Sequence, residues 1–465
     1  MQEFKVPGVS VGVIRNAAVV ISKGYGWRDV DKRLPMTPRT IMPIGSCTKS
    51  FTVTLMAILS DRGKLDWREP VRTYLPDFQL RDPVATELMT PTDLVDHLSG
   101  LPRHERMGYG RSRSREDIYR RLRFLEPSQS FRQGWQYNNL MYMTAGYLLE
   151  KLASKPWDAL LREEIFVPLG MHRSSASVQE ITDTDDHSLP YMEIDGKVAT
   201  VPYRSFDYVR PAGAINSNIE EMLRYIQMHI DQGEHQGKQI ISRRMARQMQ
   251  SLHAAMPVEL ASTDPELGPG GYGLGVNVSS YRGHKLVAHP GDVDGFAALM
   301  SWMPDDRIGV VVITNLSGTN PLPSLLQRNL YDRLLALAPV DWYGRTKKQL
   351  AETEQRRKQA EAEHAAERVP GTSPSHPLSA YVGTYEHPGY GIVQIAQQRD
   401  QLVLALDQWT VPLEHYHYDV FQMVKPPAGH RNLELAETPG VTGLTKVSFA
   451  QDKKGRLYGD RKSVV

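Results

Sequence analysis

Hydrophobic and polar residues alternate at the start of the chain. In the segment GVSVGVI, Val9, Val11 and Val13 fall on one face, as expected of a strand with one buried side. A turn at Arg15–Asn16 separates this segment from AAVVISKGYGW. The two segments therefore predict a β-hairpin.

The pattern becomes helical from about residue 50. The segment SFTVTLMAILSDRGKLD is apolar on nearly all sides, which is typical of a buried helix, and Gly63 is placed to end it. Helical spacing recurs in MYMTAGYLLEKLAS and NIEEMLRYIQMHI. A region of helices and loops is therefore expected to run to about residue 255.

Strand patterns return after this region, in GYGLGVNV, HKLVAHPG, GFAALMSWM and IGVVVITN, and a helix with LLQRNLYDRLLAL follows. The simplest architecture places the early and late strands in one antiparallel sheet flanked by helices. The middle region then forms a helical subdomain beside the sheet. This is an α+β fold.

The last quarter of the chain has a different composition. RTKKQLAETEQRRKQAEAEHAAER is dense in charged residues and alanine, which predicts a solvated helix acting as a spacer. Short strand patterns with turn residues then follow, typical of a small all-β domain or barrel. The predicted domains are 1–338 for the sheet and helices, 339–375 for the charged helical linker and 376–465 for the β-rich domain.

Charge and apolar runs narrow the class of protein. The net charge of +2 gives no indication of nucleic acid or an acidic membrane surface as a partner. No segment approaches the run of about 18 apolar residues that a transmembrane helix needs. The start of the chain lacks the features of a signal peptide. We expect a soluble protein, cytoplasmic as written and periplasmic if a leader was removed.

A serine and a lysine three residues apart precede the predicted buried helix. Residues at i and i+3 share one helix face, and Lys49 can take the proton of the Ser46 hydroxyl if burial lowers the lysine pKa. The alternative is an ordinary helix start, with Ser46 as the N-cap and Lys49 on the surface. This alternative is favoured when the pair is considered alone, because the motif fixes only two positions.

Two further short motifs carry possible chemistry. Tyr137 and Asn139, two apart before a predicted helix, could relay a proton and hold a substrate carbonyl. His289 and Gly291 end a predicted strand, where Gly291 permits close backbone approach and Pro290 makes the strand an edge, at least locally. His289 could supply a switchable positive charge or a hydrogen bond. Each motif alone is also compatible with ordinary helix caps and turns.

Metal and cofactor chemistry find little support in the sequence. His415 and His417 lie two apart on a predicted strand, but no further ligands converge on them. No metal or cofactor is expected. Cys47, the only cysteine, excludes an internal disulfide and is expected to be a small core residue. His97 is expected to be structural and to make a local hydrogen bond.

Taken together, the motifs resemble those of one family. S-x-x-K at Ser46 to Lys49, Y-x-N at Tyr137 to Asn139 and H-x-G at His289 to Gly291 resemble the serine hydrolases that include class C β-lactamases, penicillin-binding proteins and related esterases and D-aminopeptidases. The accessory stretches VPGVSVGVI, DHLSGLP, AGAINSN and YGLGV agree. The tail resembles a β-rich domain appended to many such hydrolases, for which a lipocalin-like barrel is expected.

The resemblance implies a role for each motif residue. Ser46 is the acylated nucleophile, Lys49 activates it, and Tyr137 passes protons to the leaving group. Asn139 orients the substrate and the lysine. The backbone N–H groups of Ser46 and of Asp292, which follows the H-x-G motif, would form the oxyanion hole.

One position departs from the pattern of true β-lactamases, because His289 stands where those enzymes have lysine. A substrate carboxylate would then lack a permanent positive charge. The sequence therefore predicts a hydrolase for a small-molecule ester, amide or peptide, with a β-lactamase or a penicillin-binding sensor protein as the alternative. Assembly into a homo-oligomer is left open.

Overall fold

The structure is a computed structural model of the chain. It describes all residues except 105–106, 109–112, 195, 258–263, 319, 407–408, 425–445, 452–456 and 460–465. The chain forms two compact units. The first contains Met1–Arg103, Ser114–Arg120 and Glu126–Trp342, and the second contains His104–Arg113, Arg121–Leu125 and Tyr343–Val465.

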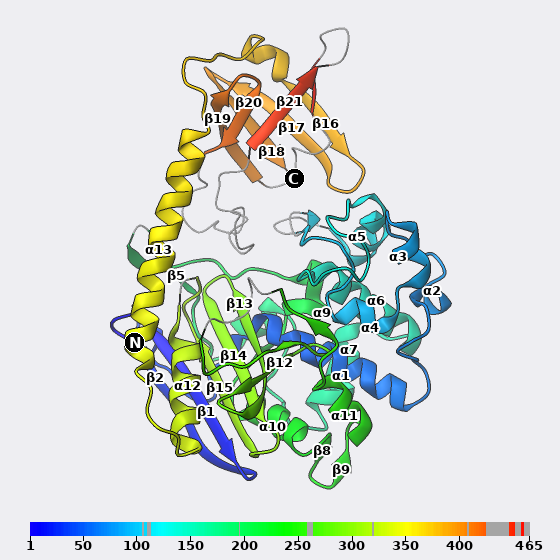
Figure 1. Ribbon diagram of the computed structural model, residues 1–465, viewed down its shortest axis with the longest axis vertical. Helices are drawn as coiled ribbons and strands as arrows, with labels where there is room; N and C mark the ends of the chain where they lie inside the picture. Colours follow the sequence, from blue (N-terminus) through cyan, green and yellow to red (C-terminus); the bar gives the residue numbers. More distant parts are fainter. Residues whose placement is uncertain are drawn as a thin grey trace. The chain divides into compact units, whose positions relative to one another are not determined.

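The first unit is built on a nine-stranded sheet in the order β10-β11-β12-β13-β14-β15-β1-β2-β3 (Figure 1). Strands β1 and β15, from opposite ends of this unit, pair antiparallel from Val9 opposite Thr314 to Arg15 opposite Ile308. This confirms the prediction that early and late strands share one antiparallel sheet. The strands are β1 (Gly8–Arg15), β2 (Ala18–Asp29), β3 (Leu34–Pro35), β10 (Ala254–Ala255), β11 (Gly271–Tyr272), β12 (Asn277–Tyr281), β13 (His284–Val293), β14 (Phe296–Met303) and β15 (Ile308–Thr314).

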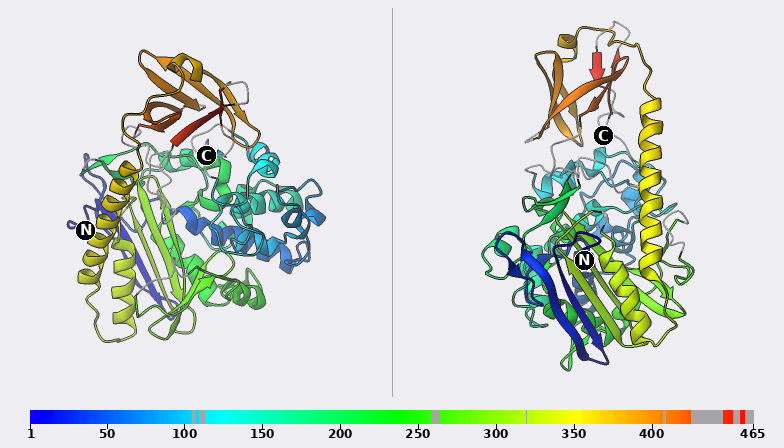
Figure 2. Two further views of the ribbon diagram at one scale, coloured as in Figure 1. Left: turned by 45° about the horizontal axis from the view of Figure 1, so that its top comes forward. Right: turned by 90° about the vertical axis from the view of Figure 1, so that its left-hand side faces the viewer.

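Alternate residues of β1 face different helices, as the two-residue period of a strand requires. Val9, Val11 and Val13 join a core that includes residues of α12 (Leu322–Leu334). Gly12, on the opposite face, lies against α10 (Ile219–Ile230). Helices therefore cover both faces of the sheet, which can be followed from two further sides in Figure 2. The hairpin turn is Asn16–Ala17, one residue later than the sequence predicts.

The predicted helical subdomain lies beside this sheet (Figure 1). Its central helix, α1 (Thr48–Asp61), is buried from Thr48 to Leu59, as its apolar sequence predicts. The other helices of this region are α2 (Val71–Tyr74), α3 (Pro83–Leu88), α4 (Pro91–Val95), α5 (Arg115–Arg121), α6 (Asn139–Ala153), α7 (Trp157–Leu161), α8 (Val178–Thr182), α9 (Arg210–Gly213) and α11 (Arg243–Met249).

One predicted strand, GYGLGVNV, is interrupted in the structure. Strand β11 ends at Tyr272 and β12 begins only at Asn277. Between them Gly275 has φ +77, and a Cβ there would lie 3.0 Å from the carbonyl oxygen of Lys49. The chain therefore turns at this point so that its backbone can pack against the start of α1, a contact that periodicity alone does not reveal.

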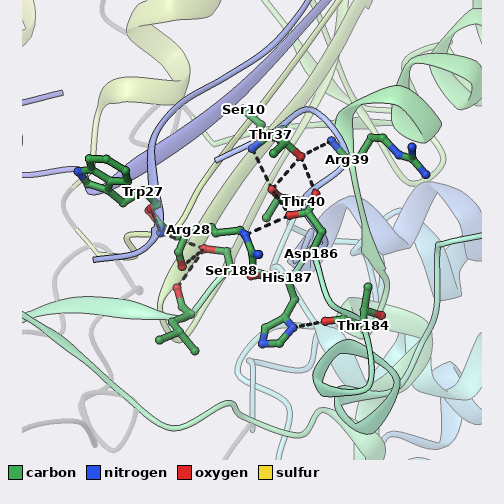
Figure 3. Close-up of polar contacts among 12 residues, drawn as sticks. Ser10, Trp27, Arg28, Thr37, Arg39, Thr40, Thr184, Asp186, His187 and Ser188 are labelled. Carbon is green, nitrogen blue, oxygen red and sulfur yellow. Dashed lines mark hydrogen bonds and ion pairs between the residues drawn. The ribbon is translucent and has the colours of Figure 1, made fainter. Parts of the chain in front are cut away.

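A polar network ties the chain entering α1 to the sheet (Figure 3). The Asp186 carboxylate accepts hydrogen bonds of 2.7 Å from the hydroxyls of both Thr37 and Thr40, and it forms an ion pair with Arg28 at 3.3 Å. Ser188 donates to the carbonyl oxygen of Arg28. These bonds connect the loop before residue 190 to β2 and to the segment that leads to Ser46.

The second unit contains the charged helix α13 (Trp342–Ala366), except for its first residue, and a β-domain. Most of α13 is exposed, as its composition predicts. Among the described residues of this unit, seven antiparallel strands follow one another in chain order and form an all-β half-barrel around the core of Tyr381, Val393 and Phe421. The strands are β16 (Gly383–His387), β17 (Gly391–Gln398), β18 (Gln401–Leu406), β19 (Trp409–His417), β20 (Val420–Met423), β21 (Lys446–Gln451) and β22 (Leu457–Gly459).

Candidate active site

Ser46 lies on the short 3-10 turn η1 (Gly45–Cys47), immediately before α1. Its side chain is half-exposed, whereas the residues on both sides of it are buried. The Ser46 hydroxyl does not cap the helix, because the N-cap of α1 is Cys47 and no side chain caps it. The oxygen instead accepts hydrogen bonds from Lys49 Nζ at 3.1 Å and from the Tyr137 hydroxyl at 2.7 Å.

Lys49 is a fully buried lysine, with no exposed surface. Its ammonium group donates to Ser46 Oγ, to Asn139 Oδ1 at 2.6 Å and to the carbonyl oxygen of Ala212 at 2.9 Å. A buried ammonium needs such partners, because removing it from water is costly. The Tyr137 ring lies 4.6 Å from Nζ, which adds a cation–π contact. Lys49 is therefore not a surface residue, which excludes the alternative considered from the sequence.

Tyr137 and Asn139 reach the site from the start of α6. The residue between them, Asn138, is the N-cap and has an extended backbone, with φ −140 and ψ 120. Neighbouring residues in extended chain point to opposite sides, so Tyr137 and Asn139 point the same way. The Asn138 side chain faces the other way and accepts from the N–H of Met141.

The third motif approaches Ser46 through its backbone. A Cβ at Gly291 would lie 1.9 Å from the carbonyl oxygen of Ile44 and 3.1 Å from the backbone nitrogen of Ser46. A Cβ at Gly45 would lie 2.9 Å from the backbone nitrogen of Asp292. The amides of Ser46 and Asp292 are thus held close together only because both glycines lack side chains.

The strand that carries this motif is locally an edge, as Pro290 predicts. Strand β12 pairs with β13 as far as Ala288 and not beyond it among the described residues, whereas β14 stays paired to Val293. The side of residues 289–293 that faces away from β14 lies against η1. A substrate bound at Ser46 would therefore lie beside this stretch of β13.

His289 is buried, with 1% of its surface exposed. Its Nδ1 lies 2.5 Å from the carbonyl oxygen of Pro290, which can only accept, so Nδ1 carries the hydrogen. Its Nε2 then accepts from the Tyr272 hydroxyl at 2.9 Å. Burial, together with the charge of Lys49, lowers the pKa of His289 to about 3. Of the two functions open from sequence, the structure favours a hydrogen-bonded neutral imidazole over a positive charge.

The structure brings all seven predicted site residues together. Hydrogen bonds link Ser46, Lys49, Tyr137 and Asn139, the backbones of Gly291 and Asp292 abut η1, and the His289 ring lies 6.4 Å from that of Tyr137. A layer of aromatic residues behind Tyr137 was not predicted. It contains His97, Tyr142 and Tyr272, with ring centroids 4.6 Å apart for His97 and Tyr272.

His97 holds this layer against the catalytic segment. Its Nδ1 accepts from the backbone N–H of Asn138, and its ring lies 4.4 Å from that of Tyr137. Burial lowers the pKa of His97 well below its ordinary value, so the ring is neutral. This packing agrees with the prediction that His97 is structural, but its hydrogen bond is made to a residue 41 positions further along the chain and is not the local bond that was predicted. Tyr272 lies in the YGLGV stretch, where its spacing alone gave no reason to single it out.

Metal-binding geometry is not found in the part of the chain that the structure describes, since no three His, Cys, Asp or Glu residues are grouped there so that they could hold an ion. His415 Nε2 lies 2.9 Å from the carbonyl oxygen of Tyr418. Likewise, none of the helices among the described residues is long and apolar enough to cross a membrane.

Comparison with known proteins places the chain in a family. A model of the family described as Beta-lactamase matches residues 1–335, more than half of the chain. The chain belongs to the Beta-lactamase family. The resemblance drawn from the three motifs is thereby confirmed. A second model, described as a domain of unknown function (DUF3471), matches residues 367–457 of this Beta-lactamase family member.

The named relatives of this family member include a hydrolase and an amidase, and the chain is itself a hydrolase of that class. Unguisins hydrolase ungD' from Aspergillus campestris is 28% identical over 436 residues, covering 88% of this chain and 78% of that protein. The octameric penicillin-binding protein homologue from Pyrococcus abyssi has a TM-score of 0.62 at 24% identity, covering 97% of this chain and 94% of that one. D-amino acid amidase from Ochrobactrum anthropi SV3 has a TM-score of 0.59 at 22% identity, covering 72% and 95%. The two solved structures share the fold.

We predict that Cys47 is unreactive in the folded protein although it adjoins Ser46. Its thiol is fully buried and donates to the carbonyl oxygen of His289, and burial raises its pKa to about 12. A thiol-specific reagent should therefore label the native chain at pH 8 only very slowly, and should label one thiol per chain after denaturation. Because Cys47 is the only cysteine, all thiol labelling of the chain reports on this residue. Rapid stoichiometric labelling of the native protein would contradict this prediction.

Asp96, next to His97, should make stability depend on pH. Burial and the neighbouring Asp93 carboxylate raise the pKa of Asp96 to about 7. The folded state therefore binds more protons than the unfolded state between about pH 4 and 7, and stability falls as the pH rises through this window, by up to about 1.4 kcal/mol per pH unit.

The variant Asp96→Asn cannot lose this proton, and its amide oxygen can still accept from the N–H of Leu98 as the carboxyl does. We expect its free energy of unfolding, relative to wild type, to be higher at pH 8 than at pH 5 by about 1–3 kcal/mol. Urea unfolding of both proteins at both pH values measures this difference. Other titrating groups contribute equally to the unfolding free energies of the two proteins, so their contributions cancel. An equal difference at the two pH values would show that Asp96 titrates normally.

Proposed function

We propose that the chain is a serine hydrolase that cleaves an ester or amide bond through an acyl-enzyme on Ser46. The observation that carries this proposal is the position of Ser46 Oγ, within hydrogen-bond distance of both Lys49 Nζ and the Tyr137 hydroxyl. A serine becomes a good nucleophile only when a neighbouring group takes its proton. Here two candidate bases contact the same oxygen.

At the start of the proposed acylation step one member of the Lys49–Tyr137 pair is deprotonated, so that the pair holds a base. Ser46 Oγ attacks the substrate carbonyl carbon while its proton passes to that base. The amides of Ser46 and Asp292 stabilise the negative charge that develops on the carbonyl oxygen. Tyr137 then donates a proton to the leaving oxygen or nitrogen as its bond to the carbonyl carbon breaks. Asn139 holds Lys49 in place through the 2.6 Å hydrogen bond.

Deacylation reverses these proton movements. Water attacks the acyl carbon and gives a proton to Tyr137, and the ester bond to Ser46 breaks as Oγ takes a proton back. The product is a carboxylic acid, and the site returns to its starting protonation. No further group is required for either step.

The neutral His289 limits the classes of substrate that the site is expected to bind well. With its Nδ1 bonded to Pro290 and its Nε2 bonded to Tyr272, the ring has no charge to hold a substrate carboxylate at neutral pH. Esters and neutral amides need no such anchor, whereas β-lactams carry a carboxylate. The names of the relatives, which include an amidase, accord with amide cleavage. Rapid β-lactam turnover is therefore not expected.

The proposal is tested with p-nitrophenyl acetate and butyrate, D- and L-aminoacyl p-nitroanilides and nitrocefin. We predict that Ser46→Ala lowers kcat for the best substrate by at least about 10³-fold, because the nucleophile is lost. Tyr137→Phe should lower it by about 10²–10⁴-fold, because proton transfer is lost. Activity retained in Ser46→Ala would refute the mechanism.

Matched controls separate chemistry from folding. Ser60→Ala changes a serine at the other end of α1, and Tyr147→Phe changes a tyrosine two turns further along α6. Both should keep kcat within about twofold of wild type, since neither side chain contacts Ser46. A single burst with nitrocefin followed by a stable adduct would instead support the penicillin-binding alternative.

A further inference from the structure

His97 lies beside Tyr137 in a backbone conformation that costs free energy. Its φ is +69, in the left-handed region that a residue with a Cβ rarely occupies. None of its surface is exposed to solvent. Strained residues persist where the surrounding contacts require them, and they cluster at functional sites. The contacts of His97 all lie around the segment that carries Tyr137.

The left-handed turn directs two acceptors of His97 towards the backbone on either side of Tyr137. Its carbonyl oxygen accepts a hydrogen bond of 2.9 Å from the backbone N–H of Gln136. Its Nδ1 accepts a hydrogen bond of 3.1 Å from the backbone N–H of Asn138. Gln136 and Asn138 are the two neighbours of Tyr137 in the chain. A single residue therefore holds both peptide units that flank the tyrosine.

The imidazole ring also supports the Tyr137 side chain directly. The two rings have centroids 4.4 Å apart and planes tilted by 36°. The imidazole contacts the rings of Tyr142 and Tyr272 as well, with centroids 5.3 and 4.6 Å away. Close packing of this kind leaves a side chain little room to change its rotamer. The Tyr137 hydroxyl is thus held at 2.7 Å from Ser46 Oγ.

Only one nitrogen of the His97 ring forms a hydrogen bond. Because Nδ1 accepts, the hydrogen of the neutral ring is on Nε2. This buried N–H forms no hydrogen bond with any residue that the structure describes. An unpaired buried donor costs free energy, and a phenyl ring would fill the same space without that cost. The acceptor at Nδ1 is therefore what distinguishes histidine from an apolar residue at this position.

The segment after His97 fixes the same part of the catalytic segment. The Asn138 side-chain Nδ2 donates to the carbonyl oxygens of Leu101 at 3.2 Å and of Pro102 at 2.7 Å. Asn138 is consequently held through its backbone by His97 and through its side chain by the residues that follow. These contacts turn the Asn138 side chain away from Ser46 and leave Tyr137 on the side of the nucleophile.

We propose that His97 is a positioning residue of the hydrolase, which holds Tyr137 in the orientation needed for proton transfer with Ser46. Its left-handed backbone and its Nδ1 acceptor are both part of this role. The inference rests on the proposed function, because it assumes that Tyr137 moves protons during turnover. His97 is buried, so it acts through Tyr137 and not on the substrate.

Two amide variants test which atom of His97 matters. His97→Asn places an amide oxygen close to the position of Nδ1, and asparagine tolerates a positive φ better than most residues. His97→Gln carries the same amide one methylene further out, closer to Nε2. We expect His97→Asn to keep kcat for the best ester within about fivefold of wild type and His97→Gln to lower it by about 10²-fold, because a misplacement of about 1 Å costs this much. KM should change by less than about threefold in either variant.

A double-mutant cycle with Tyr137→Phe separates positioning from general damage to the fold, with kcat expressed per folded enzyme from circular dichroism. Because His97 acts through the Tyr137 hydroxyl, His97→Gln should lower kcat by no more than about threefold when that hydroxyl is absent. The control His229→Gln changes another buried histidine of the same unit, whose ring lies against Tyr225 and Trp302. It should change kcat by less than about twofold in either background.

Equal losses of kcat in His97→Asn and His97→Gln would overturn the positioning role. So would a folded His97→Asn that loses about 10²-fold or more, which keeps the test decisive if His97→Gln does not fold. Wild-type kcat in Tyr137→Phe would overturn the proposed function itself. A loss in Tyr137→Phe that adds in full to the loss in His97→Gln would overturn only the inference about His97.

Discussion

The burial of the Lys49 ammonium is the constraint on which the rest of the site depends. A lysine without exposed surface must find acceptors for its hydrogens inside the protein. Here those acceptors come from its own helix turn, from the start of α6 and from α9. The hydrogen bonds of one buried amino group thus hold together three segments that are far apart in sequence. The same contacts place Ser46 Oγ between the lysine and Tyr137, which is the arrangement that general-base activation requires.

A second constraint acts through backbone rather than side chains. Gly45 and Gly291 allow the nucleophile turn and β13 to meet more closely than any residue with a Cβ would permit. Behind them, Tyr272 and Pro290 bind both nitrogens of His289, so the third motif supports the strand and does not present a charge. The consequence for function is that the histidine of the third motif places no fixed positive charge beside Ser46.

Sequence alone predicted much of this structure, because the relevant signals are local. Alternation in GVSVGVI identified β1, and the all-round apolar pattern after Ser46 identified the buried helix α1. The spacing of Tyr137 and Asn139 correctly placed both side chains on one side. Contacts between distant segments were not predictable from spacing. The break at Gly275, the layer of His97 and Tyr272, and the acceptor at Ala212 all depend on what packs against them. The protonation of His289 likewise follows from burial, which a motif does not specify.

The central claim is that Ser46 carries the acyl group during turnover. The most direct measurement is to quench the enzyme with acid during turnover of a p-nitrophenyl ester and to map the modified residue by peptide mass spectrometry. The account predicts one acyl group per chain, on Ser46, that accumulates when deacylation is slowed and is absent from Ser46→Ala. An acyl group found on another residue, or steady turnover by Ser46→Ala, would contradict it.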